Sequence, residues 1–134
     1  MSGSSRFHIY YSQNTYFVNG AYDSSNTLYA ADLDYDDTTS YGPEITTIHK
    51  LTPGTYYFYV HDYTNKYIPT SNEMAKSSAT VSVYQGSSSS PIRRYTVNSN
   101  SSGVYWNVCK ITIDSSQNVE VESVNTYDTV ETYN

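Results

Sequence analysis

Cysteine is nearly absent from this sequence, and so are the residues that build long helices. Cys109 is the only thiol in 134 residues, which excludes an intramolecular disulfide. Leu, Ala, Glu and Lys are few, and charged residues make up only 15% of the chain. A disulfide-rich scaffold and a long-helix fold are therefore both excluded.

Basic residues are scarce as well. Seven Lys and Arg stand against 13 Asp and Glu, for a formal net charge of -6, whereas phosphate binding requires clustered cations. Arg93-Arg94 is the only basic pair, and we interpret it as part of a solvated strand face. No apolar run has the length of a membrane span. We therefore expect no nucleic-acid partner and no membrane insertion.

Tyrosine dominates what remains. The sequence holds 17 Tyr against three Phe and one Trp, in a background of Ser, Thr and Asn. Tyr, Thr and Val favour strands, while Ser, Asn, Asp and Gly favour turns. This composition predicts an all-β fold, and we expect an antiparallel β-sandwich, Ig-like or jelly-roll-like, of about eight or nine strands. We expect a single domain over residues 6–126, an end segment or loop over residues 1–5, and a tail or linker over residues 127–134.

Short β-type runs separated by turn residues define the expected elements. Ser71–Ser77 is expected to form one helical turn capped by Ser71 or Asn72, and Gly86–Pro91 to form a hairpin loop. The expected strands are Arg6–Tyr11, Thr15–Val18, Leu28–Leu33, Ile45–Leu51, Gly54–Asp62, Thr80–Tyr84, Ile92–Val97, Val104–Ile113 and Val119–Val124.

The fifth expected strand carries the densest aromatic run. Alternation along an extended chain puts Tyr56, Phe58 and Val60 on one face. Tyr57 and Tyr59 then lie on the other face. Aromatic residues on both faces indicate either a central strand or a strand with one face used as a contact surface.

One acidic segment stands out in this low-charge chain. In extended conformation Asp32, Asp34 and Asp36 project to the same side, roughly 6.5–7 Å apart. Ca²⁺ takes about six to eight oxygen ligands, which clustered carboxylates supply. Asp32, Asp34, Asp36, Asp37 and Glu44 are therefore the candidate metal ligands, with Ca²⁺ as the candidate ion. The alternative is an acidic, solvated strand end that resists edge-to-edge pairing.

Motifs for catalysis are missing from the sequence. His8, His49 and His61 are interpreted as structural, and His61-Asp62 is not an acid–base pair because neighbouring strand residues point to opposite faces. Cys109 has no adjacent His to activate it, so we interpret it as a small buried residue. No nucleophile elbow, HExxH or Walker A motif occurs. We therefore predict that the chain is not an enzyme.

The Tyr excess allows two interpretations. Exposed rings in a β-sandwich can form platforms for sugar rings, with Ser, Asn and Asp bonding the sugar hydroxyls, and Tyr is a large contact residue with few rotatable bonds. Alternatively, Tyr replaces Phe in the core with its hydroxyl reaching the surface. Because 17 Tyr exceed what the core of so small a domain can hold, we expect some of them to line an exposed surface.

Several segments together resemble a family of bacterial modules. They are Arg6–Ser12 (RFHIYYS), Ala31–Glu44 (ADLDYDDTTSYGPE), Tyr59–Tyr63 (YVHDY), Ala79–Tyr84 (ATVSVY) and Trp106–Ile113 (WNVCKITI). In these segments the chain is similar to YfaP-like, DUF2135-type β-sandwich domains of large, exported, multi-modular surface proteins. The resemblance implies a secreted or cell-surface location and no established catalytic activity.

The sequence departs from that family at its first strand. Such domains begin with a further strand that carries a DLD-type acidic motif, upstream of the segment resembled by Arg6–Ser12. We expect the absence of this strand to leave a sheet edge exposed, which favours dimerisation or strand exchange with another chain.

Two functions follow as expectations. The leading hypothesis is a non-catalytic, extracellular structural or adhesive module of a bacterial surface protein, stabilised by calcium. The alternative is a carbohydrate-binding module that uses exposed Tyr residues. The expected partner is accordingly a cell-surface protein or a glycan.

The calcium hypothesis predicts a thermal midpoint that rises with added Ca²⁺ and falls with EDTA. A ligand that binds only the folded state adds about 2.7 kcal/mol to the free energy of unfolding at 100 times its dissociation constant. An unchanged midpoint across millimolar Ca²⁺ would instead support the solvated strand end.

Overall fold

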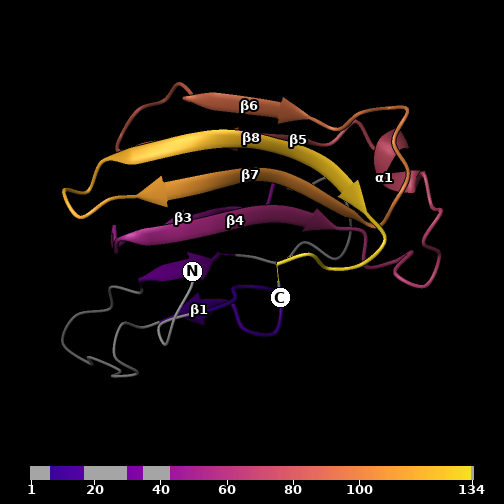
Figure 1. The fold of residues 1–134 in the computed structure, drawn as a ribbon, viewed down its shortest axis with the longest axis horizontal. Helices are drawn as coiled ribbons and strands as arrows, with labels where there is room; N and C mark the ends of the chain where they lie inside the picture. The colour runs from indigo at the N-terminus through magenta and orange to yellow at the C-terminus, as the bar shows by residue number, and fades with distance from the viewer. Residues whose placement is uncertain (1–6, 17–29, 35–42, 134) are drawn as a thin grey trace. The chain divides into compact units, whose positions relative to one another are not determined.

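The computed structural model describes residues 7–16, 30–34 and 43–133. These residues form eight strands and one short helix, which confirms the all-β prediction. The strands build three antiparallel sheets, in the orders β1-β2-β3, β4-β7-β8 and β5-β6 (Figure 1). The elements are β1 (Thr15–Tyr16), β2 (Ala31–Leu33), β3 (Thr46–Ile48), β4 (Gly54–His61), α1 (Glu73–Lys76), β5 (Thr80–Val83), β6 (Arg93–Thr96), β7 (Tyr105–Ile113) and β8 (Val119–Asp128).

The chain divides into two compact units. The first comprises residues 1–54 with 113–118, and the second comprises residues 55–112 with 119–134. A single domain over residues 6–126 and a sandwich arrangement of the sheets therefore stay predictions.

The first unit contains the sheet β1-β2-β3. Thr15 pairs with Asp32, and Asp32 pairs in turn with Thr47 of β3. Ala30 and Ala31 are buried, and Phe7 stacks on Tyr16 at 3.9 Å between ring centroids.

The expected strand Arg6–Tyr11 is wrong over its described residues. Tyr10 and Gln13 exchange two backbone hydrogen bonds, of 3.1 and 2.9 Å, and so close a tight turn. The backbone N–H and C=O of Tyr10 are both satisfied within this turn. Tyr10 therefore makes local hydrogen bonds to Gln13 instead of extending a sheet.

The second unit contains the sheet β4-β7-β8, the hairpin β5-β6 and α1. Thr80 pairs with Thr96 and Val83 with Arg93, so the segment that follows β5 is the expected hairpin loop. Helix α1 lies within the expected helical turn, and Ser71 Oγ accepts the Glu73 backbone N–H at 3.3 Å. No helix in the described ranges is long and apolar enough to cross a membrane.

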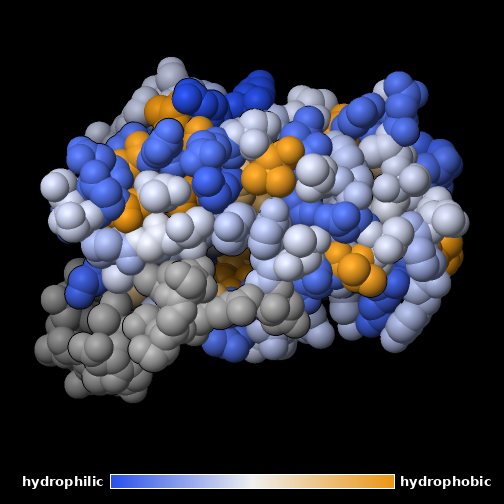
Figure 2. Space-filling view, viewed as in Figure 1, coloured by the Kyte–Doolittle hydropathy of each residue, from blue (hydrophilic) through white to orange (hydrophobic). Residues whose placement is uncertain are grey.

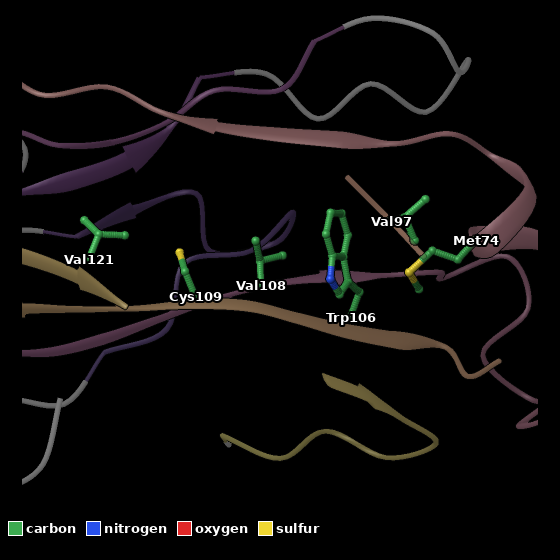
Figure 3. Close-up of a cluster of buried hydrophobic side chains, with 6 residues drawn as sticks. All are labelled: Met74, Val97, Trp106, Val108, Cys109 and Val121. Atoms are coloured by element: carbon green, nitrogen blue, oxygen red, sulfur yellow. The ribbon is translucent and has the colours of Figure 1, made fainter. Parts of the chain in front are cut away.

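The core of the second unit gathers on one face of β4-β7-β8. Its buried members are Met74, Val97, Trp106, Val108, Cys109 and Val121 (Figure 3). Side chains of β4, β5 and β6 pack against it, among them Phe58, Val81 and Tyr95. The hairpin β5-β6 therefore contributes to the same core as the three-stranded sheet.

Strict alternation is broken in the middle of β7. Trp106, Val108 and Cys109 rise from the same side of the strand in Figure 3, although Val108 and Cys109 are consecutive. Two consecutive inward residues mark a β-bulge-like irregularity.

Among the described strands, β4 is an edge strand of its sheet, because it pairs only with β7. Within the described ranges, β4 therefore does not take the central place that one interpretation of its two aromatic faces requires. Phe58 and Val60 pack on the core, while Tyr57 on the opposite face is 41% exposed. The second interpretation, one face used as a contact surface, remains.

The view in Figure 2 shows a largely hydrophilic surface with hydrophobic residues in small separate groups. This character agrees with a composition rich in Ser, Thr, Asn and Tyr, whose side chains carry hydroxyl or amide groups.

Replacing Gly103 is predicted to destabilise the fold for two reasons: its backbone has a positive φ, and another backbone segment lies close to its Cα. Its φ is +129°, and an added Cβ would lie 2.8 Å from the backbone oxygen of Asp128. Gly103→Ala should lower the free energy of unfolding by about 3 kcal/mol or more, measured by denaturant titration.

Gly86→Ala is the matched control. Gly86 also has positive φ, +62°, but nothing lies within 4 Å of its added Cβ. Its cost should be only about 1 kcal/mol. Equal losses from both variants would contradict a steric role for Asp128.

Candidate functional site

The predicted calcium ligands lie only partly within the described chain. Asp32, Asp34 and Glu44 are described, whereas Asp36 and Asp37 lie outside the described residues. Within the described ranges, no group of three or more His, Cys, Asp or Glu side chains is arranged to hold a metal ion. The five-residue calcium site stays a prediction.

Two of these carboxylates already have protein partners. Asp32 Oδ1 lies 3.1 Å from His49 Nε2, across the β2-β3 pair. Asp34 Oδ1 accepts the backbone N–H of Ile45 at 3.0 Å. Since Ca²⁺ prefers an all-oxygen shell, a bound ion would compete with His49 for Asp32 Oδ1.

The second unit carries a row of ring side chains on the face of β4 away from its core. We call this row the aromatic ladder; its members are Tyr57, Tyr59, His61, Tyr63, Tyr67, Tyr105 and Tyr133.

Strand β4 supplies the central members. Tyr57, Tyr59 and His61 are two residues apart, so the pleat directs all three side chains to one face. Tyr105 of β7 contacts two of them. Its ring centroid lies 5.9 Å from that of Tyr59. Its ring stacks on the His61 ring, with 4.2 Å between centroids and 9° between planes. The pairing of β4 with β7 brings Tyr105 beside Tyr59 and His61. The Asp62 backbone N–H, just after β4, donates a hydrogen bond to the carbonyl of Val104, just before β7.

The loop after β4 extends the aromatic ladder beyond the strand. Tyr63 meets His61 edge-on, with 5.7 Å between ring centroids. Lys66 Nζ lies 3.6 Å from the Tyr63 ring centroid and 5.2 Å from that of Tyr67. Tyr63 is 51% and Tyr67 86% exposed, so both rings present large surfaces to solvent.

Hydrogen bonds between the Asp62 carboxylate and Asn65 hold this loop. One Asp62 carboxylate oxygen accepts the Asn65 backbone N–H at 3.2 Å, and both oxygens accept from Asn65 Nδ2. This arrangement orients Asp62 toward the turn that carries Lys66. The Asp62 carboxylate is thus engaged with Asn65.

The other end of the aromatic ladder is covered by residues 129–133, which we call the return segment. Strand β8 runs to Asp128, and the chain then turns back to finish alongside β4 (Figure 1). Tyr133 stacks on Tyr57 with 4.0 Å between ring centroids and 9° between planes. The Tyr59 hydroxyl donates a hydrogen bond to a Glu131 carboxylate oxygen.

Burial shifts the pKa values of Tyr59, Tyr105 and His61 in the direction that favours the neutral form. It raises the pKa of Tyr59 above its ordinary value, and the hydrogen bond and negative charge of Glu131 add to this effect. Burial also raises the pKa of Tyr105. Burial lowers the pKa of His61 and outweighs the opposing influence of Glu131 and Asp62. At neutral pH the imidazole therefore adds a ring face and no charge.

His61 has one polar atom that its described surroundings leave unsatisfied. Its Nε2 is buried and finds no hydrogen-bond partner among the described residues. A neutral imidazole nitrogen can accept or donate one hydrogen bond, so leaving this buried atom without a partner is unfavourable.

Sequence reasoning missed part of this site. The sequence predicts a tail or linker over residues 127–134, which includes Glu131 and Tyr133. In the structure Tyr127 and Asp128 end β8, and Glu131 and Tyr133 contact β4. The spacing of Tyr57, Tyr59 and His61 was the available signal for β4. No local signal showed where the return segment lies.

Cys109 lies in the core, as the sequence predicted, and only 1% of it is exposed. Burial raises the pKa of its thiol from 9.0 to about 11. A thiol with a raised pKa is mostly protonated at neutral pH and is a poor nucleophile.

The folded protein should therefore leave Cys109 unmodified by a thiol reagent at pH 8, and guanidinium should release one reactive thiol per chain. Because the folded pKa exceeds the unfolded one, the thiol's contribution to stability is present below pH 9.0 and is lost as pH rises toward about 11. Rapid labelling of the native protein at pH 8 would contradict this burial.

The chain was compared with protein-family models, with curated proteins and with solved structures, and none of them matches it.

Proposed function

We propose that this chain is a non-catalytic, secreted or cell-surface module that binds carbohydrate through the aromatic ladder. The observation that carries the proposal is the row of rings along β4 and the following loop, which ends in the exposed faces of Tyr63 and Tyr67. The proposal develops the Tyr-based alternative from the sequence and gives it a specific surface.

Ring faces suit sugars because a pyranose presents an apolar face of C–H groups beside its hydroxyls. The C–H face packs on an aromatic ring, and the hydroxyls require polar partners at the edges. The aromatic ladder offers both kinds of group: Tyr ring faces, and the hydroxyls of Tyr59 and Tyr105.

The length of the aromatic ladder favours a chain over a single sugar. Alternate residues of a strand are roughly 6.5–7 Å apart, so Tyr57 and His61 are separated by about 13 Å along β4. Tyr63 and Tyr67 lengthen the surface further. A surface of this extent accommodates several sugar residues of a polysaccharide.

Charge favours a neutral polysaccharide. The chain carries a net charge of -6, and Glu131 lies at the aromatic ladder itself. The Lys66 ammonium group lies over the rings of Tyr63 and Tyr67. An anionic polysaccharide would meet repulsion from the protein as a whole.

A calcium-stabilised structural module is the second candidate. It is favoured by two acidic residues close together in the sequence: Asp32 lies in β2, and Asp34 directly follows this strand. Its family assignment, a DUF2135-type module of a bacterial surface protein, is also a proposal. Both candidates are compatible with adhesion, since a surface module can bind a glycan and be stabilised by an ion.

The binding proposal predicts that removing the exposed rings weakens retention by neutral polysaccharides. Affinity electrophoresis through gels containing soluble β-glucan, xylan or galactomannan measures this directly. Tyr67→Ala and Tyr63→Ala should each weaken binding by about tenfold, as expected from the loss of one stacking contact.

Tyr84→Ala is the matched control, because Tyr84 is 52% exposed and is not a member of the aromatic ladder. It should migrate as the unmodified protein does. Full retention of binding by Tyr63→Ala and Tyr67→Ala would contradict the proposed surface, as would the failure of folded protein to bind any of the three polysaccharides.

A further inference from the structure

We infer that the return segment, residues 129–133, is an intramolecular competitor that covers the Tyr57–Tyr59 end of the aromatic ladder until a polysaccharide displaces it. This inference rests on the proposed function, and it concerns the regulation of that same surface.

The contacts of the return segment are those that a sugar would need. Tyr133 lies flat on Tyr57, at 4.0 Å and 9°, and occupies the ring face on which a pyranose would stack. Glu131 accepts a hydrogen bond from the Tyr59 hydroxyl, which could otherwise donate to a sugar oxygen. The Tyr133 ring thus takes the place of the stacked face of a sugar, and the Glu131 carboxylate takes the place of its hydrogen-bonding oxygen.

The return segment touches the ladder through alternate residues. Glu131 and Tyr133 are partly buried, whereas Thr129 and Thr132 are exposed and Val130 is 68% exposed. The Thr132 hydroxyl donates to Asp128 at 2.8 Å, at the end of β8. Attachment through two side chains, with the intervening residues in solvent, suits a contact that opens reversibly.

The two ends of the aromatic ladder differ accordingly. Tyr63 and Tyr67 are exposed by half or more, whereas the Tyr57 ring is paired with Tyr133 and the Tyr59 hydroxyl with Glu131. A polysaccharide would meet the loop end first and extend toward Tyr57 only as Tyr133 is displaced. Glu131 also places a negative charge near His61, Tyr59 and Tyr105, and this charge leaves the surface with the return segment.

The size of the effect depends on how often the return segment is closed. The apparent affinity equals the affinity of the open state multiplied by the fraction of molecules that is open. If about one molecule in ten is open, apparent affinity is about tenfold below that of the uncovered ladder.

The test combines Glu131→Gln and Tyr133→Ala in the full chain. Binding is measured by affinity electrophoresis and by calorimetry, with the neutral polysaccharides used above as probes. The double variant should bind about tenfold more tightly than the unmodified chain. Val130→Ala, at an exposed position of the same segment, is the matched control and should leave affinity unchanged.

Each other outcome has a distinct meaning. If the unmodified chain binds and the double variant binds equally or more weakly, competition is overturned and Tyr133 is instead part of the binding surface. If neither chain binds any probe while both melt cooperatively, the proposed function fails and competition fails with it.

Amide hydrogen exchange provides a readout that a purely structural contact would not change. Saturating polysaccharide should accelerate exchange in residues 129–133 of the unmodified chain while it slows exchange in β4. Slower exchange in both segments would overturn displacement, even if affinity in the double variant rose.

Discussion

The burial of Trp106 in the middle strand of β4-β7-β8 is the interaction on which the second unit depends. Its ring is fully buried, and its Nε1 donates to Asn125 Oδ1 at 2.9 Å, which ties β7 to β8. Asn125 adopts a positive φ of 51° within β8, and Tyr127 lies parallel to the Trp106 ring. A large side chain with its one polar atom satisfied secures the position of β7 between its neighbours.

The candidate site is the other side of the same strands. Because successive residues alternate, the inward direction of Trp106 requires Tyr105 to point outward, and the inward direction of Phe58 does the same for Tyr57 and Tyr59. Each strand thus contributes to core and ladder at once. Tyr suits the outer face since its ring packs on neighbours while its hydroxyl finds a polar partner, as Tyr59 does in Glu131.

Strand positions were largely predictable because they follow from local patterns of β-branched and aromatic residues. The prediction failed at Arg6–Tyr11, where the Tyr10–Gln13 turn satisfies the backbone locally. It also ended β8 too early, at Val124, because the next residue, Asn125, is a weak strand former. Trp106 and Asn107 overcome that weakness: they bond the side chains of Asn125 and Thr126 across the strands, a long-range contact that no local pattern contains.

The sequence by itself determined an all-β chain, the location of most strands, a buried Cys109 and an excess of Tyr beyond what a core can hold. These properties depend on composition and on a period of two, which are local quantities. Only the tertiary structure decided which Tyr residues share a surface, because β4, β7 and the return segment are far apart in the chain. Tyr57 and Tyr133 meet through the path of β8 and the turn after Asp128, and no local pattern encodes that closure.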